Sequence, residues 1–476
     1  MDGPPAADVG LEAIALDGGG TLAVAPAGVA SAGGRISYET ALRIAQVGRV
    51  AVIWLPIWAI CVAQFRNSFT ALLASVVYLA IWKATFRRSY AEASVTVWTI
   101  GAGVPALVGA VTGALVATPV AVGVRAIHLS GLALIEIAAA VLVSSALWES
   151  TVARSLAARR RILVVGTAGG GTELLEDVAL APRLPFEVVG VVDADSGAEQ
   201  IAGLPMLGTF EELAEIVRRE RPQIVVLSND RRGDAFEKIV EVGHLGFVVV
   251  GVAEFYEYAF GRLPVRNLTP QWFMSVLHLY RRPYSQLLKR SFDLAVAAVG
   301  AALLAPLVPV IALLVRRTPG PVVFRQTRLG EGGTPFTIYK FRTMREDAEK
   351  DGAVWAAAFD ARVTSVGRLL RKTRLDEIPQ LWNVLRGEMS IVGPRPERPE
   401  FVAELEAEVP FWSRRHLVKP GITGWAQIRR GYTADAAGTG DKLSYDLWYL
   451  RHRSIVVDIA ICAKTFWTLV SGSGAR

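Results

Sequence analysis

Two adjacent carboxylates, Asp376 and Glu377, have the residue types and the setting best suited to chemistry in this chain. An isolated Asp-Glu pair is usually a pair of helix-surface charges, but here the apolar run IPQLWNVL follows at once and cations flank both sides. Nearby cations lower carboxyl pKa values, so the sequence predicts an ionised aspartate that acts as a nucleophile or a Mg²⁺ ligand. A carboxylate can accept a phosphoryl group, and the same cations could bind a diphosphate. The cations are Arg368, Arg371, Lys372, Arg374, Arg386 and Arg395.

The dyad belongs to the middle one of three basic blocks punctuated by Gly and Pro, at residues 320–344, 362–396 and 419–428. The middle block ends in VGPRP, whose prolines restrict the backbone and would present Arg395 on a rigid loop; a bare turn is the alternative. In the first block, YKFRTM sets Lys340 and Arg342 two residues apart. They would share one face of a strand, although surface charges are the alternative there.

An apolar run that precedes these blocks would hold them at a membrane. Residues 294–315 are flanked by Lys289-Arg290 and Arg316-Arg317, with Pro306 and Pro309 near the middle. Proline inside a helix removes a hydrogen bond and bends the axis. We expect a re-entrant helix over 286–317 that breaks at Ala305 and Pro306; a straight fifth transmembrane helix is the alternative.

Four further apolar stretches come earlier in the chain, which is 52% hydrophobic. Each is about long enough to cross a hydrocarbon core of roughly 30 Å, which predicts a four-helix transmembrane domain over 35–150 after a flexible tail at 1–34. Basic residues concentrate on one side, so both ends of the bundle are expected in the cytoplasm. The stretches are 44–65, 68–86, 94–122 and 127–148.

Residues 151–283 alternate short apolar strands with helical segments, which predicts a Rossmann-like α/β domain. Its glycines, Gly166 and Gly169 to Gly171, do not have the dinucleotide spacing, although Asp193 could imitate a ribose-binding acid. A structural or regulatory domain is favoured over a nucleotide-binding one. The remaining residues, 284–476, are expected to form an α/β catalytic domain.

Composition excludes several other classes. The net charge of +7 comes without any nucleic-acid-binding motif, so we expect no nucleic-acid partner. The five histidines lack metal-ligand spacing, and Cys61 and Cys462 lie in apolar surroundings that favour packing over a disulfide.

At the three basic blocks the sequence resembles the polyprenyl-phosphate hexose-1-phosphate transferases, the bacterial sugar transferase family of monotopic phosphoglycosyl transferases. Its layout is similar to that of the large members that initiate exopolysaccharide, capsule or O-antigen synthesis. The resemblance implies a multi-pass protein of the bacterial inner membrane with its catalytic domain on the cytoplasmic face. It implies transfer of a hexose-1-phosphate from a UDP-sugar, with UDP-glucose or UDP-galactose favoured, to undecaprenyl phosphate. A homodimer is compatible with the architecture.

The resemblance also assigns roles. Asp376 would be the nucleophile that carries the phosphosugar, and Glu377 would help to position Mg²⁺ or the acceptor. Basic residues of the blocks would bind phosphate, and an acidic residue of the third block would complete the site. These are Lys340, Arg342, Arg371, Arg395 and Asp446.

Two positions depart from the family pattern, which usually has Ser where Ala305 and Arg374 stand. Neither changes the dyad. The C-terminal segment, with Asp458 and Lys464 among apolar residues, is expected to be an interfacial amphipathic helix. A scaffold with a degenerate catalytic domain is the alternative from another functional class.

Overall fold

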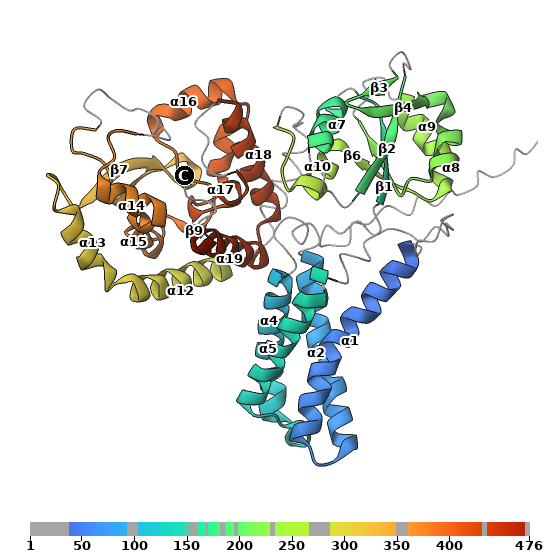
Figure 1. Ribbon diagram of the computed structural model, residues 1–476, viewed down its shortest axis with the longest axis horizontal. Helices are drawn as coiled ribbons and strands as arrows, with labels where there is room; N and C mark the ends of the chain where they lie inside the picture. The colour runs from blue at the N-terminus through green and yellow to red at the C-terminus, as the bar shows by residue number, and fades with distance from the viewer. Residues whose placement is uncertain are drawn as a thin grey trace, which may run out of the picture.

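The computed structural model describes residues 38–92, 103–148, 150–151, 160–167, 170–180, 186–194, 199–228, 234–265, 286–348, 360–430 and 436–471. The predicted tail at 1–34 lies outside these ranges. Figure 1 shows a helical bundle, an α/β domain with a central sheet and a larger C-terminal domain. The three parts follow one another in the chain, as the sequence predicts.

In the described residues the bundle has four helices packed side by side. Stretches in three of them are long and apolar enough to cross a membrane: Val47–Gln64, Ser68–Phe86 and Gly131–Trp148. The apolar part of the remaining helix, Gly109–Gly123, is shorter. Residues 94–102 of the expected stretch lie outside the described residues. The fourth span therefore stays a prediction. The helices are α1 (Tyr38–Gln64), α2 (Ser68–Glu92), α4 (Gly103–Gly123) and α5 (Gly131–Trp148).

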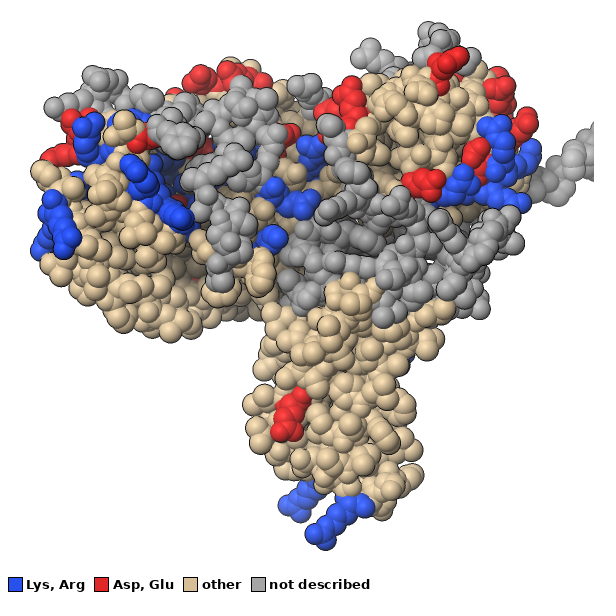
Figure 2. All heavy atoms as spheres, in the orientation of Figure 1, with Lys and Arg blue, Asp and Glu red and all other residues tan. Residues whose placement is uncertain are grey.

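Small residues let α4 approach the aromatic side chains of α2. A Cβ atom on Gly109 would lie 2.6 Å from the Phe86 ring, and one on Gly113 would lie 2.5 Å from Trp82 Nε1. Where lipid supplies no hydrophobic drive between helices, such close backbone contact is a main source of association. The bundle ends in loops that contain Arg66 and Arg125, and Figure 2 shows Lys or Arg atoms at that end.

The α/β domain contains a six-stranded sheet of order β3-β4-β2-β1-β5-β6, parallel except for β3. Helices α7 and α10 cover one face, and α8 and α9 cover the other. This is the predicted doubly wound arrangement. The strands are β1 (Arg160–Val165), β2 (Phe186–Asp193), β3 (Gln200–Ile201), β4 (Leu204–Thr209), β5 (Ile224–Leu227) and β6 (Val248–Gly251). The helices are α7 (Gly171–Leu180), α8 (Leu213–Glu220), α9 (Asp234–Val242) and α10 (Val252–Phe260).

Asp193, which ends β2, has a partner within the protein. Its carboxylate accepts hydrogen bonds from the backbone N–H, at 2.8 Å, and the hydroxyl of Thr167 in the glycine-rich turn. Gly166 opens this turn with φ +84°, a left-handed conformation that favours glycine. The contact gives Asp193 a structural role in the turn; nucleotide binding stays a prediction.

The C-terminal domain begins with two helices bent by 66°, α12 (Gln286–Leu304) and α13 (Leu307–Val315). The break lies at Ala305 and Pro306. The other helices are α14 (Ser365–Thr373), α15 (Gln380–Arg386), α16 (Pro399–Glu408), α17 (Trp425–Arg430), α18 (Ala436–His452) and α19 (Ile455–Ser471). Strands β7 (Val323–Leu329) and β8 (Pro335–Phe341) pair antiparallel, and β9 (Ser390–Val392) and β10 (Gly421–Thr423) pair in parallel.

The basic pair Lys289-Arg290, near the start of α12, faces the protein rather than the solvent. Lys289 Nζ lies 2.7 Å from Asp458 Oδ2 on α19 and 3.1 Å from Asp293 Oδ1. Arg290 donates to the carbonyls of Val384 and Leu385 at the end of α15. These contacts attach α12 to the rest of the domain.

Exposed apolar side chains mark the opposite side of the bent helices. Leu287 is 76% exposed and Leu303 is 73% exposed, and Leu313 on α13 is 67% exposed. Figure 2 shows an almost uncharged surface on the side of the domain where α12 lies in Figure 1. Asp458 on α19 is fully buried, so its charge faces the interior of the domain. The interfacial position of α19 stays a prediction.

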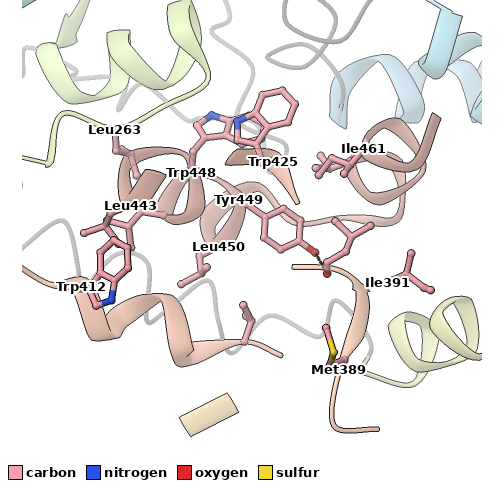
Figure 3. Close-up of a cluster of buried hydrophobic side chains, with 14 of the residues drawn as sticks. Leu263, Met389, Ile391, Trp412, Trp425, Leu443, Trp448, Tyr449, Leu450 and Ile461 are labelled. Carbon is pink, nitrogen blue, oxygen red and sulfur yellow. Dashed lines mark hydrogen bonds between the residues drawn. The ribbon is translucent and has the colours of Figure 1, made fainter. Parts of the chain in front are cut away.

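Residues at the end of the α/β domain also pack into the core of the C-terminal domain. Leu263, which follows α10, packs with Trp425 and Trp448, whose rings stack 4.6 Å apart (Figure 3). Trp425 Nε1 donates to the Gly261 carbonyl at 2.6 Å, and Arg451 pairs with Glu257 at 2.6 Å. The boundary expected at 283/284 lies outside the described residues, and packing with the catalytic core begins earlier.

Candidate active site

The dyad lies in a tight turn between two helices. Thr364 caps the start of α14 by accepting a hydrogen bond from Gly367 N at 2.9 Å, and α14 ends at Arg374, whose φ of +57° is left-handed. Leu375–Glu377 then form one 3₁₀ turn, and Pro379 leads into α15. The backbone reversal places Asp376 and Glu377 inside the domain, where each is 7% exposed.

Three cations surround Glu377. Lys340 Nζ, on β8, lies 2.9 Å from Oε1, and Arg395 Nη1 lies 3.3 Å from the same oxygen. Arg374 Nη1 lies 3.8 Å from Oε2. This last contact gives a physical account of the arginine that stands where the family usually has serine. The structure thus joins the first block to the centre and the C-terminal end of the middle one.

Asp376 differs from its neighbour because no described residue donates a hydrogen bond to its carboxylate or forms an ion pair with it. Burial raises its pKa, the Glu377 carboxylate adds to this, and the cations oppose it, Lys340 most strongly. The cations do lower the pKa of this aspartate, but burial outweighs them, so the expected net decrease is wrong. Burial also acts on Glu377, but Lys340, Arg395 and Arg374 outweigh it and hold its pKa well below the ordinary value.

The loop that carries Arg395 is fixed by glycines of two blocks. A Cβ atom on Gly393 would lie 2.3 Å from the Lys419 carbonyl oxygen, and one on Gly421 would lie 2.1 Å from Gly393 N. A Cβ atom on Gly424 would lie 2.2 Å from the Gly393 carbonyl oxygen. The VGPRP and KPGITG segments thus contact each other through their backbones, which explains why both need glycine.

Arg371 lies on α14 and faces the first block. Its Nε donates to Thr343 Oγ1 at 2.9 Å, and its charge lowers the pKa of Asp376. The contact is close because a Cβ atom on Gly367 would lie 2.0 Å from the Thr343 carbonyl oxygen. Arg371 is therefore part of the cationic surroundings of the dyad.

Arg342 is not brought into this cluster. It is 6% exposed, and its guanidinium donates to the carbonyls of Pro321, Val315 and Thr318, the first at 2.7 Å. These carbonyls lie at and just beyond the end of α13, so Arg342 caps the bent helix. The structure gives it a structural role in place of the predicted phosphate contact.

Asp446 also lies apart from the dyad, in a buried network on α18. Its Oδ2 accepts hydrogen bonds from Arg415 Nε and Nη2 at 3.1 and 2.7 Å, and Arg415 Nη1 donates to Glu397 Oε1 at 3.0 Å. Glu397 directly follows VGPRP, so this network fixes the base of the Arg395 loop. Sequence reasoning did not single out Arg415 or Glu397, although the position of Glu397 next to VGPRP was a usable signal.

The dyad fits a shared Mg²⁺ rather than a metal bound by protein alone. The described residues contain no cluster of three or more His, Cys, Asp or Glu side chains that could hold a metal. Mg²⁺ is usually bound by one or two carboxylates together with substrate phosphates and water. Asp376 and Glu377 supply two carboxylates of this kind.

The fold and the dyad define a class, a membrane-associated transferase with a buried carboxylate pair beside a cationic loop. The family model described as “Bacterial sugar transferase” matches residues 284–472, and one described as “CoA-binding domain” matches residues 87–228. The chain is 36% identical to the UDP-glucose:undecaprenyl-phosphate glucose-1-phosphate transferase of Escherichia coli, over 64% of this chain and 67% of that protein. It belongs to the bacterial sugar transferase family, which confirms the resemblance found in the three blocks.

Two more relatives show how the match is distributed. A UDP-glucose:undecaprenyl-phosphate glucose-1-phosphate transferase of Caulobacter vibrioides is 41% identical over 39% of this chain and 71% of its own length. The UDP-N-acetylgalactosamine-undecaprenyl-phosphate N-acetylgalactosaminephosphotransferase of Aeromonas hydrophila is 42% identical over 48% of this chain. The chain spans about half of that relative's length, 53%.

Proposed function

We propose that this protein transfers a hexose-1-phosphate from a UDP-sugar to undecaprenyl phosphate, giving an undecaprenyl-diphosphate sugar and UMP. This would be the first membrane step of exopolysaccharide, capsule or O-antigen synthesis. Relatives named for this reaction with glucose and with N-acetylgalactosamine support the substrate class. UDP-glucose or UDP-galactose is the proposed donor.

The observation that carries the proposal is the contrast between the two carboxylates. Glu377 is held by cations, whereas Asp376 is equally buried and has no hydrogen bond or ion pair to a described residue. An unpartnered buried carboxylate is costly to the fold and is characteristic of a functional site. Asp376 is therefore the proposed nucleophile.

The reaction proceeds in two displacements. An oxygen of ionised Asp376 attacks the phosphorus that carries the sugar, the bond from that phosphorus to the bridging oxygen breaks, and UMP leaves with the bonding electrons. A phosphate oxygen of the lipid then attacks the same phosphorus and displaces the Asp376 carboxylate. Lys340 and Arg395 stabilise the negative charge on the phosphates, with Glu377 holding both cations in place.

Asp376 and Glu377 would hold Mg²⁺ together with phosphate oxygens of the substrates. When bound, the ion supplies positive charge that reduces the repulsion between approaching phosphates.

The proposed membrane arrangement follows from the exposed apolar side chains of α12 and α13 and from the bend between them. The bent helices enter and leave the same leaflet of the bacterial inner membrane. Basic residues are more numerous at the end of the bundle where the chain enters and leaves than at the Arg66 and Arg125 end. This asymmetry favours the cytoplasmic face for the catalytic domain. There the lipid phosphate and a soluble UDP-sugar can both reach the dyad.

The test measures UMP release by the purified protein in nanodiscs with Mg²⁺, undecaprenyl phosphate and a panel of UDP-hexoses and UDP-N-acetylhexosamines. Wild type should release UMP over many turnovers only when the lipid is present, and Asp376→Asn should release none. Release of UDP would contradict transfer of a phosphosugar. If folded protein releases no UMP with any donor, the result would favour a scaffold with a degenerate catalytic domain.

A further inference from the structure

One face of α18 is held against the loop that presents Arg395. Lys442 and Asp446 are four residues apart and therefore lie on the same face of this helix. Asp446 is bound by Arg415, which is 2% exposed and also binds Glu397 at the base of the Arg395 loop. The buried network thus fixes the face of α18 that carries Lys442 relative to that loop.

Lys442 is a half-buried lysine whose ammonium has no hydrogen-bond acceptor in the described part of the chain. It forms no hydrogen bond or ion pair with a described residue, and both carboxylates near it, Glu397 and Asp446, are engaged by Arg415. Burial lowers the pKa of the Lys442 ammonium, Glu397 and Asp446 oppose this, and Arg415 and Arg395 add to it. Lys442 is within electrostatic range of two guanidinium groups, and such a cluster of cations is favourable only when anions are shared among them.

We propose that Lys442 is a further substrate-binding residue of this site, whose ammonium binds a phosphate oxygen together with the guanidinium of Arg395. The inference rests on the proposed function, because that reaction brings phosphate groups to the Arg395 loop. Phosphate is the shared chemistry of two sources, the nucleotide donor and the lipid acceptor. A bound phosphate would give Lys442 a direct anionic partner, which Glu397 and Asp446 do not because Arg415 engages both of them.

The experiment compares wild type with Lys442→Met, which removes the charge, and Lys442→Arg, which keeps it. Lys464→Met removes a charge from an exposed position on α19 and serves as the matched control. The KM for the UDP-sugar is measured at saturating lipid phosphate, and the KM for the lipid phosphate at saturating UDP-sugar. Binding of UDP is measured in parallel by titration calorimetry on the full-length protein in nanodiscs.

Loss of a hydrogen bond to a charged group should weaken the affected substrate by about tenfold or more in Lys442→Met. A higher KM for the UDP-sugar, with weaker UDP binding, assigns the contact to the donor. A higher KM for the lipid alone assigns it to the acceptor. In either case Lys442→Arg should recover most of the loss, and Lys464→Met should match wild type.

The proposal is overturned if both KM values and UDP binding are unchanged in Lys442→Met. It is also overturned if only kcat or the melting temperature falls and Lys442→Arg is no better, because that pattern indicates a structural role. If wild type itself releases no UMP, the proposed function fails. The UDP titration then still tests Lys442: weaker UDP binding in Lys442→Met supports a phosphate contact, and unchanged UDP binding counts against one.

Discussion

Lys340 and Arg395, which come from different blocks of the sequence, meet at one atom, Oε1 of Glu377, at distances of 2.9 and 3.3 Å. Glu377 therefore neutralises part of the charge of this cationic cluster and fixes both cations. Asp376, next to it in the chain, keeps its carboxylate for chemistry. The two members of the dyad are chemically similar but have different surroundings, and this difference leads to predictions about pH.

The first half-reaction should fail as the pH falls. Attack requires ionised Asp376, and burial raises the pKa of this group, so the ionised fraction is lost as pH falls through a value above its ordinary one of 3.8. The measurement is the burst of UMP released in a single turnover without lipid acceptor, which avoids titration of the lipid phosphate. A burst that is independent of pH down to the ordinary aspartate range would contradict the raised pKa.

Glu377→Gln should move this acid limb to lower pH. The substitution removes the negative charge that helps to raise the pKa of Asp376, while Lys340 and Arg395 remain. The burst rate should also fall, by about 10²-fold, because the two cations lose their shared anchor. The limb is measured with the same single-turnover assay.

Glu377→Asp is the matched control because it keeps the charge and shortens the side chain. We expect it to lose rate while leaving the acid limb close to that of wild type. A limb that moves equally in both variants would mean that geometry, rather than charge, sets the pKa of Asp376.

The contact between the VGPRP and KPGITG segments predicts a sharp difference between two glycines. A Cβ atom on Gly421 would lie 2.1 Å from Gly393 N, whereas one on Gly440 would have nothing within 4 Å. Gly421→Ala should destabilise the domain by about 1–3 kcal/mol, because the backbone must move. Gly440 lies in α18, so Gly440→Ala should be neutral or stabilising by up to about 1 kcal/mol.

Thermal unfolding in detergent measures both variants. Activity should fall with stability in Gly421→Ala, since the displaced backbone carries Arg395. Equal melting temperatures for the two variants would show that the loops can separate without loss.

Much of this arrangement could be predicted from sequence, and the failures have physical causes. Apolar length, strand–helix alternation and prolines act locally, so the bundle, the α/β sheet and the position of the bend could be predicted. Arg342 and Asp458 could not be placed correctly. The sequence does not show whether a charged residue contacts substrate, caps a helix or lies in a buried ion pair. Its role depends on segments distant in the chain, which are α13 for Arg342 and Lys289 for Asp458. The pKa of Asp376 was misjudged because burial, which neighbouring letters do not show, outweighs the cations.

The buried pair of Lys289 and Asp458 yields the last prediction. Their charged atoms lie 2.7 Å apart and link α12, the first of the two bent helices, to α19. Removing one partner leaves the other charge buried, so Lys289→Met should destabilise the protein by about 3–5 kcal/mol. Replacing both, as Lys289→Met with Asp458→Leu, should recover much of this loss, because the buried Asp458 charge is then gone and Asp293 still accepts hydrogen bonds from Ser390 and Ile391.

Stability of the single and double variants is compared by thermal unfolding in nanodiscs, with UMP release as a second measurement. Lys464→Met, on the exposed side of α19, controls for loss of positive charge. If the double variant is as unstable as Lys289→Met alone, the loss comes from Asp293 instead, because both variants remove its contact with Lys289, at 3.1 Å. If it recovers stability but not activity, the ion pair sets the angle at which the bent helices present the dyad to the membrane.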